Sequence, residues 1–173
     1  MRRLILNLAV SLDGFIDGPN GEFDWCFTDQ DYGMKKFLGE IDTIFFGRKS
    51  YELLTRMEKD PYPKMKKYVF SRTLQSVKGA TVVRDDIESR VRSIKGEGGK
   101  DIWLFGGAAL TAQLMKLNLV DELQLAVHPI LLGRGKPLFA AVDKRVGLTL
   151  VNSKVYSTGL VQLFYHQVRR SLS

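Results

Sequence analysis

Cysteine and histidine are among the rarest residues of this sequence. Cys26 is the one cysteine, and His128 and His166 are the two histidines. Because one thiol cannot build a disulfide framework, the chain suits a reducing compartment, and we expect a cytoplasmic protein. Neither histidine has a second His or Cys at metal-ligand spacing, so the sequence predicts no metal site. No candidate base lies near Cys26 in the sequence, so a small, partly buried thiol is a better interpretation than a nucleophile.

Long apolar runs are also missing. No run approaches the roughly 18 residues of a membrane-spanning helix, so we expect no membrane partner. The N-terminal stretch "MRRLILNLAVSLDGF" has two arginines and an apolar run, but the run is short and alternating. An A-x-A-like cleavage site is absent, which favours a first strand over a signal peptide. A serine hydrolase is unsupported, because the sequence has no G-x-S-x-G.

What the sequence does have is enough apolar residues for a core. Its 173 residues are 45% hydrophobic and contain no low-complexity tract, which predicts a single globular domain over residues 1–173. The formal net charge is +7, with basic blocks at 64–67 ("KMKK") and 169–173 ("RRSLS"). This charge suits nucleic acid or an anionic small molecule. The basic blocks lack the interleaved aromatic residues that stack on bases, so we expect a small-molecule substrate and no nucleic acid.

Hydrophobic periodicity divides the first 120 residues into alternating strands and helices. Strands are predicted at 3–11, 42–47, 67–71, 80–84 and 101–105, with helices at 29–39, 48–59, 87–96 and from 108 onward. Residues 12–25 are predicted to form a loop. After residue 120 the pattern predicts a strand at 121–127 and a hairpin around residues 157–159. The sequence therefore predicts an α/β fold with a mostly parallel central sheet, antiparallel C-terminal strands and flanking helices.

Turns with small or basic residues follow four of the predicted strands. They are "SLDG" (11–14), "FGRKS" (46–50), "FSRT" (70–73) and "FGGAA" (105–109). The carboxyl ends of parallel strands share one edge of a sheet, and ligands of such sheets bind there. Together the turns favour a nucleotide site more strongly than any one of them does alone.

Two glycines, Gly106 and Gly107, join the apolar run 102–105 to a helix that repeats Leu110, Leu114 and Leu117. A glycine turn can serve tight packing, because Gly has no Cβ to clash. It can also expose backbone N–H groups at a helix N-terminus, where phosphates bind. A full G-x-G-x-x-G is absent, so the residues alone leave both interpretations open.

The turn after the second strand places basic residues where a helix begins. Gly47 ends the strand, and Arg48, Lys49 and Ser50 open the helix. Cations oppose the helix dipole at that end, so a bound phosphate explains them better than a solvated helix start capped by Ser50.

Ser71 and Arg72 follow the third strand in the same way. Arg beside a hydroxyl can hold the phosphate that distinguishes NADP from NAD. An exposed turn without a ligand is an equal alternative.

Two carboxylates stand near these turns. Asp13 lies in "SLDG", where an Asp side chain commonly bonds to the backbone of its own turn. Asp31 opens the first predicted helix, as an N-cap residue does. In a cleft, Asp31 could also relay a proton to a substrate ring.

Five stretches occur in an order similar to that of the dihydrofolate reductase-like superfamily. They are "LILNLAVSLDGFI", "IFFGRKSYE", "YVFSRT", "DIWLFGGAALTAQLMK" and "VDELQLAVHPILLGRGKPLF". The chain most resembles the riboflavin-biosynthesis branch, meaning the C-terminal reductase domain of the bifunctional deaminase–reductase and its small stand-alone relatives. The resemblance covers roughly residues 2–167 and implies the three-layer dihydrofolate reductase-like fold.

The resemblance implies NADPH bound across the strand ends, and a homodimer, which is common in the riboflavin branch. The implied cofactor-binding residues are Ala9 and Ile16 near the nicotinamide, Gly47, Arg48, Lys49 and Ser50 at a phosphate, Ser71 and Arg72 near the adenosine 2′-phosphate, and Gly106 and Gly107 at the pyrophosphate, flanked by Phe105, Ala108, Ala109 and Leu110.

One difference from the family's sequence pattern leaves the identity of the substrate undecided. Phe105 stands directly before the double glycine, where many riboflavin-type reductase domains carry Glu. Asp31 matches the acidic residue of true dihydrofolate reductases when the "GRKSY" turn is aligned without gaps. Our hypothesis is that Asp31, or a water held by Asp13, is the proton source.

We therefore expect an NADPH-dependent oxidoreductase. It would resemble 5-amino-6-(5-phosphoribosylamino)uracil reductase or dihydrofolate reductase, transferring a hydride to a small heterocyclic or ribosyl substrate. The first alternative is an NADP-binding protein of the same fold without turnover, which the absent Glu motivates. A basic nucleic-acid-binding domain ranks last, because it would leave the strand-end turns unexplained.

Overall fold

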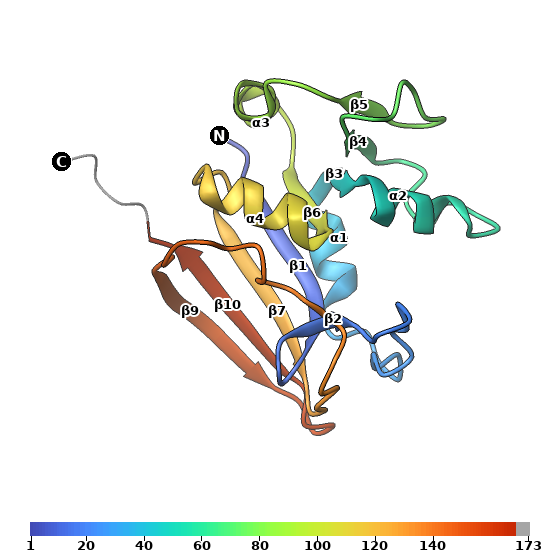
Figure 1. Cartoon of the computed structure of the whole chain (residues 1–173). Helices are drawn as coiled ribbons and strands as arrows, with labels where there is room; N and C mark the ends of the chain where they lie inside the picture. Colours follow the sequence, from blue (N-terminus) through green and yellow to red (C-terminus); the bar gives the residue numbers. More distant parts are fainter. Residues whose placement is uncertain (169–173) are drawn as a thin grey trace.

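The computed structural model describes residues 1–168. Its frame is an eight-stranded sheet in the order β5-β4-β3-β6-β1-β7-β10-β9 (Figure 1). Strands from β5 to β7 pair in parallel, whereas β10 runs antiparallel to both β7 and β9. The predicted α/β fold is confirmed. The strands are β1 (Leu4–Ser11), β3 (Ile41–Gly47), β4 (Lys66–Phe70), β5 (Thr81–Val83), β6 (Asp101–Gly106), β7 (Glu122–His128), β9 (Leu148–Val155) and β10 (Val161–Gln167).

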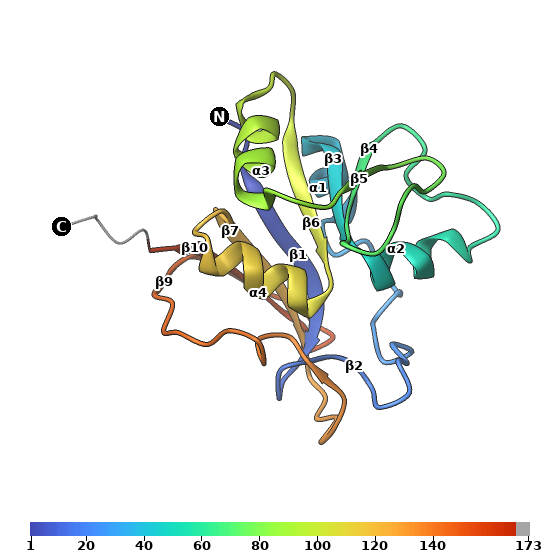
Figure 2. The same cartoon turned by 45° about the horizontal axis from the view of Figure 1, so that its top comes forward.

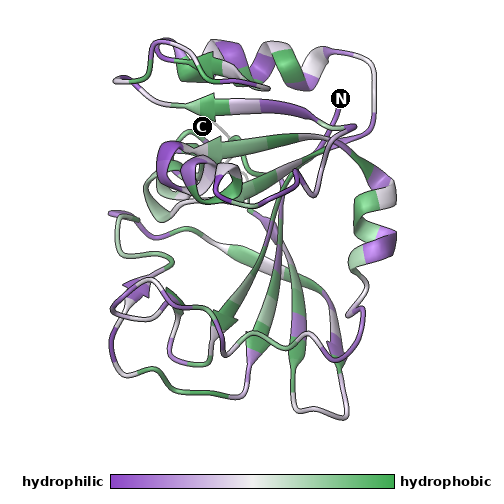
Figure 3. Cartoon of the chain, turned by 90° about the vertical axis from the view of Figure 1, so that its right-hand side faces the viewer, coloured by the Kyte–Doolittle hydropathy of each residue, from purple (hydrophilic) through white to green (hydrophobic). Residues whose placement is uncertain are grey.

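Helices cover both faces of this sheet, which gives the three layers. One face packs against α1 (Met34–Glu40) and α2 (Arg48–Thr55), the other against α3 (Ile87–Gly96) and α4 (Ala108–Lys116) (Figures 1 and 2). Hydrophilic and hydrophobic segments alternate along the helices, as expected when one side of a helix packs on a sheet (Figure 3).

Alternation along the strands supplies both halves of the core. In β1, Leu4 and Leu6 belong to the cluster under α3 and α4, and Ile5 belongs to the cluster under α1 and α2. Ile94 and Leu114 are fully buried, and the burial of each such side chain stabilises the fold by roughly 2–3 kcal/mol.

The carboxyl ends of four adjacent parallel strands lie level with one another. Gly47 at the end of β3 pairs with Phe70 of β4, which pairs with Val83 of β5. On the other side of β3, Phe46 pairs with Gly106 at the end of β6. The turns that leave these strands therefore meet at one edge, as the sequence predicted for a ligand site.

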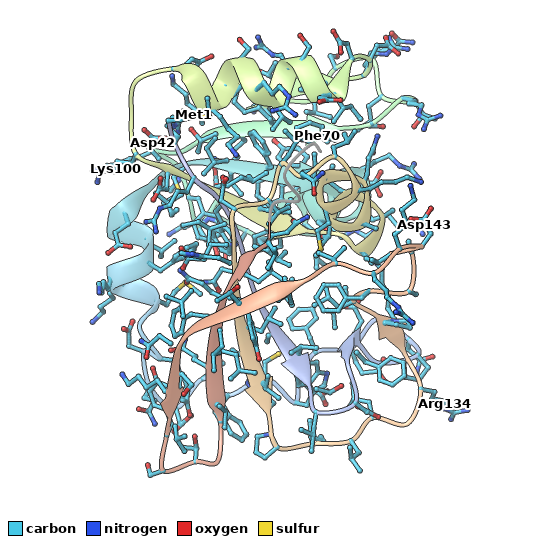
Figure 4. The ribbon with its side chains drawn as sticks, turned by 90° about the vertical axis from the view of Figure 1, so that its left-hand side faces the viewer. Met1, Asp42, Phe70, Lys100, Arg134 and Asp143 are labelled. Atoms are coloured by element: carbon cyan, nitrogen blue, oxygen red, sulfur yellow. The ribbon has the colours of Figure 1, made fainter. Side chains whose placement is uncertain are left out.

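Ion pairs fasten the opposite edge, where the parallel strands begin. The buried Arg2 pairs with Asp42, and the buried Lys95 pairs with Asp121 at 2.5 Å. Asp42 lies beside the N-terminus, while Arg134 lies at the far end of the molecule (Figure 4). Because loss of one partner from a buried pair costs about 3–5 kcal/mol, we assign these charges to stability.

Three local predictions were wrong. The helix expected at 29–39 begins at Met34, because Tyr32 (φ 48°) and Gly33 (φ 82°) adopt left-handed conformations. The helix α2 ends at Thr55, before the expected residue 59. Inside the expected loop, β2 (Phe15–Asp17) pairs with β8 (Lys136–Pro137) in a two-stranded sheet. The basic block 169–173 lies outside the described residues.

Candidate functional site

A cavity of about 1580 Å³ opens on the α1 side of the sheet. Its walls come from β1, β6, β7, β9 and β10, from α1 and α2, and from the loop 18–33. Sites for one small molecule usually occupy about 300–1,000 Å³, so this cavity has room for two ligands side by side.

The predicted site residues divide between this cavity and its surroundings. Those that line it are Ala9, Ile16, Asp31, Lys49, Ser50, Phe105, Gly106 and Gly107. Those outside the lining are Asp13, Gly47, Arg48, Ser71, Arg72, Ala108, Ala109 and Leu110. Ala108 and Leu110 are buried in the core under α4, and Ala109 faces solvent.

The double glycine lies against the turn that follows β3. A Cβ on Gly47 would be 3.5 Å from the carbonyl oxygen of Gly106, so the two backbones are nearly in contact. Gly106 has φ +121°, a conformation that side chains other than Gly rarely adopt. The backbone N–H of Gly107 donates to Oγ of Ser50 at 3.2 Å. The glycines thus serve close packing and also bring two helix starts together.

These two helix starts form a site that suits an anion. Both α2 and α4 begin without a side-chain cap and without an acidic residue in the first turn, which leaves their N–H groups and positive dipole ends available. Arg48 and Lys49 add charge in the first turn of α2. The buried hydroxyl of Thr111, which also lines the cavity, has no hydrogen-bond partner within residues 1–168. The residues present therefore fit a phosphate-bearing cofactor.

The turn after β4 lies at the same edge, and hydrogen bonds to Ser71 fix its backbone. Oγ of Ser71 accepts hydrogen bonds from the backbone N–H groups of Thr73 and Leu74, at 3.3 and 3.2 Å. Arg84, which follows β5, donates to the carbonyl oxygen of Arg72 at 3.4 Å. Sequence reasoning missed Arg84, because it placed this residue inside the predicted strand 80–84, whereas β5 ends at Val83 and Arg84 belongs to the strand-end turn. It adds a cation beside Arg72.

The two candidate proton sources differ in their surroundings. Asp13 accepts hydrogen bonds from Oγ of Ser11 at 2.6 Å and from the N–H of Gly133 at 2.8 Å. The hydrogen bond from Ser11 is the main cause that lowers the pKa of the Asp13 carboxyl. The bond from Gly133 ties the loop after β1 to the loop after β7. Asp31 lines the cavity, where its carboxylate accepts from the N–H groups of Gly33 (3.1 Å) and Lys35 (3.0 Å) and so caps α1.

Aromatic rings surround Phe105. Its ring centroid lies 4.9 Å from those of Phe46 and Trp103, and Tyr62 packs on Trp103 at 5.2 Å. The position before the double glycine is thus an apolar wall of the cavity, which suits a flat ring and disfavours a carboxylate.

His128 attaches the loop 18–33 to the sheet. Its Nδ1 lies 2.9 Å from the carbonyl oxygen of Ala126, and its Nε2 accepts from the N–H of Phe27 at 3.1 Å. The ring centroids of Trp25 and Phe27 lie 5.3 and 5.0 Å away. Burial lowers the pKa of His128, so the neutral ring that can accept from Phe27 is favoured.

Other chemistries find little support in residues 1–168. They contain no group of three or more His, Cys, Asp or Glu that could hold a metal ion. Burial raises the pKa of Cys26 to about 11, which suppresses thiolate chemistry. None of the helices described is long and apolar enough to cross a membrane.

The sheet order, the antiparallel C-terminal strands and a cavity at the strand ends are those of a dihydrofolate reductase-like protein. The structure of dihydrofolate reductase from Enterococcus faecalis, complexed with NADP(H), matches with a TM-score of 0.69 at 20% identity, over 95% of this chain and 96% of that one. At this identity the likeness shows the fold.

The chain belongs to the RibD C-terminal domain family, whose model matches residues 2–162. Uncharacterized protein YyaP of Bacillus subtilis (strain 168) is 47% identical over 178 residues, which cover 95% of each chain. A crystal structure from Shewanella sp. PV-4, of a protein named for riboflavin biosynthesis, matches with a TM-score of 0.86 at 25% identity, over 96% of this chain and 99% of that one. The resemblance inferred from the sequence is confirmed, and it places the chain among reductase relatives.

Proposed function

We propose that the protein is an NADPH-dependent reductase that acts on a small heterocyclic or ribosyl substrate. The observation that carries this proposal is the junction of the two uncapped helix starts, where Ser50 bonds to Gly107 beside Arg48 and Lys49. A helix N-terminus attracts phosphate, and two such termini at one edge suit a pyrophosphate.

The same edge supports our proposal that the protein prefers NADPH to NADH. Ser71, Arg72 and Arg84 lie at the ends of β4 and β5, one strand beyond the phosphate-holding turn of β3. Arg pairs with phosphate through a planar fork of donors, so this cluster suits the adenosine 2′-phosphate. We assign the nicotinamide to Ala9 and Ile16, which line the cavity together with Gly106.

When bound, NADPH would supply a hydride to the carbon of a C=N or C=O group of the substrate, and a proton would complete the reduction at the nitrogen or oxygen. The chain orients the two ligands and excludes water with the aromatic wall around Phe105. Asp31 is our candidate for handling the proton, because it lines the cavity. Asp13 lies outside the lining, where its carboxylate is held by Ser11 and Gly133, so we place it second to Asp31 as the source of the proton.

The principal alternative is an NADP-binding protein of the same fold that does not turn over substrate. The apolar position of Phe105 favours it, because the Glu of many related reductases is replaced by a ring in an aromatic cluster. This alternative predicts NADPH binding without reduction of any pterin or ribosylaminopyrimidine. A basic nucleic-acid-binding domain predicts salt-sensitive binding of RNA or DNA that does not depend on Arg48 and Lys49.

Cofactor binding is the first experiment. Nicotinamide fluorescence should show tight binding of NADPH and weaker binding of NADH to the wild-type protein. The double variant Arg48→Ala with Ser71→Ala should lose most of this preference. Arg145→Ala with Ser93→Ala, two exposed residues outside the cavity lining, is the matched control. Failure of both cofactors to bind would reject the reductase.

We also propose a cytoplasmic homodimer. The edge strand β9 is exposed along its whole length, and Leu150, Val151 and Val155 are more than half exposed. An exposed apolar edge strand invites pairing with a second copy. Light scattering that gives the mass of one 19.6 kDa chain would reject the dimer.

A further inference from the structure

The far half of the cavity lies over β7, β10 and β9, beyond the proposed cofactor edge. Strand register arranges its floor as two rows of side chains that cross four strands. The first row is Asn7, Gln124, Phe164 and Asn152, and the second is Ala9, Ala126, Gln162 and Lys154. All eight side chains line the cavity. The helices on this side of the sheet, α1 and α2, make their main contacts with β3 and β4, away from this part of the floor.

Carboxamides dominate this floor and their orientations are fixed. Nδ2 of Asn7 donates to Oε1 of Gln124 at 2.9 Å, and Nε2 of Gln124 donates to Glu122 at 2.8 Å. Gln162 donates to the carbonyl oxygen of Tyr32 at 2.8 Å and accepts from the hydroxyl of Tyr156 at 2.9 Å. The ordered amides of Asn7 and Gln124 suit the edge of a neutral, polar ring.

Aromatic side chains stand around these amides. Phe164 lies between Gln124 and Asn152 in the first row, and Tyr32 meets Tyr156 with ring centroids 4.8 Å apart. Rings and amides together recognise flat heterocycles, because the faces stack while the edges form hydrogen bonds.

Lys154, on the edge strand β9, adds a positive charge at the outer end of the second row of floor side chains. Its Nζ lies 4.5 Å from the centroid of the Tyr156 ring, and it forms no ion pair within the described residues. By contrast, Lys67, Lys95 and Lys116 are each paired with an aspartate. The charge of Lys154 is therefore available to a ligand.

Lys154 is too far from the double glycine to serve the same phosphates. Four strand spacings separate β6 from β9, and at roughly 4.8 Å each they span about 19 Å across the sheet. A bound anion at Lys154 therefore belongs to the second ligand.

We propose that the floor over β7, β10 and β9 is the substrate half of the cavity, and that Lys154 is a specificity-determining residue of this floor, which favours ligands with an anionic group over their neutral analogues. This inference rests on the proposed reductase function. The anionic group is a carboxylate or a phosphate, since an ammonium attracts either one.

Two pairs of probes test the selection. The first pair is dihydrofolate, which has a carboxylate tail, and dihydropterin, which has none. The second is 5-amino-6-(5-phosphoribosylamino)uracil and its dephosphorylated nucleoside. KM is measured with saturating NADPH. Where no turnover occurs, Kd is measured by tryptophan fluorescence in the presence of NADP⁺. The proteins are wild type, Lys154→Gln and Lys144→Gln, the last an exposed lysine outside the cavity lining.

We expect the anionic member of at least one pair to bind wild type about tenfold more tightly than its neutral partner, as a charge-assisted bond allows. Lys154→Gln should reduce the ratio to about one or two, while the neutral probe, NADPH binding and thermal stability stay unchanged. Lys144→Gln should behave as wild type.

Two of the remaining outcomes overturn the inference, and a third identifies the anion that the subsite binds. An unchanged ratio in Lys154→Gln, or no binding of any probe to the NADPH-loaded protein, rejects the subsite and leaves the cofactor site intact. Failure of NADPH itself to bind rejects the reductase, and the subsite with it. A phosphate-only or carboxylate-only effect identifies which anion the subsite takes.

Discussion

The hydroxyl of Ser50 accepts a hydrogen bond from the backbone N–H of Gly107 at 3.2 Å. This bond joins the first turn of α2 to the start of α4, although 57 residues separate the two in sequence. It holds the two helix N-termini at a fixed spacing, and a ligand with two adjacent phosphates needs such a spacing.

Ser50→Ala should weaken NADPH binding about fivefold, because it removes the acceptor that positions Gly107. Fluorescence titration measures the effect. Ser93→Ala, an exposed serine on α3, should bind NADPH as wild type does. Equal affinity in the Ser50 and Ser93 variants would mean that the bond does not organise the cofactor site.

Gly106→Ala should lower the free energy of unfolding by about 1–3 kcal/mol. The new methyl group has open space around it, so the loss comes from the φ of +121° and not from a clash. Urea denaturation measures the change. Gly96→Ala, at the end of α3 and also with open space, should be neutral or slightly stabilising. A fully stable Gly106→Ala would contradict the backbone geometry.

Asp31→Asn should reduce turnover while NADPH binding is retained. The Oδ1 of Asn can still accept from the N–H of Lys35 and so cap α1, while the bond from the N–H of Gly33 to the second carboxylate oxygen is lost together with the titratable carboxyl. Steady-state rates across pH, with NADPH affinity measured in parallel, separate the two effects. A turnover rate equal to that of wild type would exclude Asp31 as the proton source.

Acidification should destabilise the protein through His128. Burial lowers its pKa in the folded state below the ordinary value of 6.5, so the unfolded chain binds the proton first. The contribution of neutral His128 to the free energy of unfolding is therefore fully present above about pH 6.5. It falls as the pH drops toward the pKa of His128 in the folded state. Denaturation midpoints between pH 8 and pH 5 should show this fall in wild type and in His166→Gln, since His166 is exposed. A fall of the same size in His128→Gln would assign it to other groups.

Cys26 should react slowly with thiol reagents in the folded protein. Its pKa, raised from 9.0 to about 11 by burial, leaves about a hundredfold less thiolate at neutral pH. Ellman's reagent at pH 8 should modify the native protein far more slowly than the protein in guanidinium chloride. Similar rates in the two states would show that the thiol is accessible and ionisable.

Periodicity predicted the long elements, and it failed where structure depends on distant partners. The two-residue strand β8 carries no pattern of its own, and it pairs with β2, whose residues lie about 120 positions earlier in the chain. The start of α1 was misplaced because Asp31 resembles an N-cap, while the left-handed Tyr32 and Gly33 delay the helix. A side-chain cap can precede a helix by several residues when the backbone turns first.

The turns at the strand ends were visible in the sequence because each carries its own Gly, Ser or Arg signal. The residues of the far floor were not, since Asn7 and Lys154 come together only through the register of β1, β7, β10 and β9. Thr111 was also missed, because a threonine inside a predicted helix gives no sign that its hydroxyl is buried without a partner.

One uninterrupted hydrogen-bonded sheet runs beneath both halves of the cavity, from β6 to β9. A sheet of this kind resists shear, so we expect no hinge to open between the two bound molecules, and their separation stays constant during turnover. The loop 18–33 lines the cavity and is not a strand of this sheet, to which it is attached by hydrogen bonds from Phe27 to His128, from Gln162 to Tyr32 and from Tyr32 to Thr158 of the β9–β10 turn. In the proposed reaction, admission of substrate and release of product then require these three hydrogen bonds to break, so we expect loop opening to influence the overall rate.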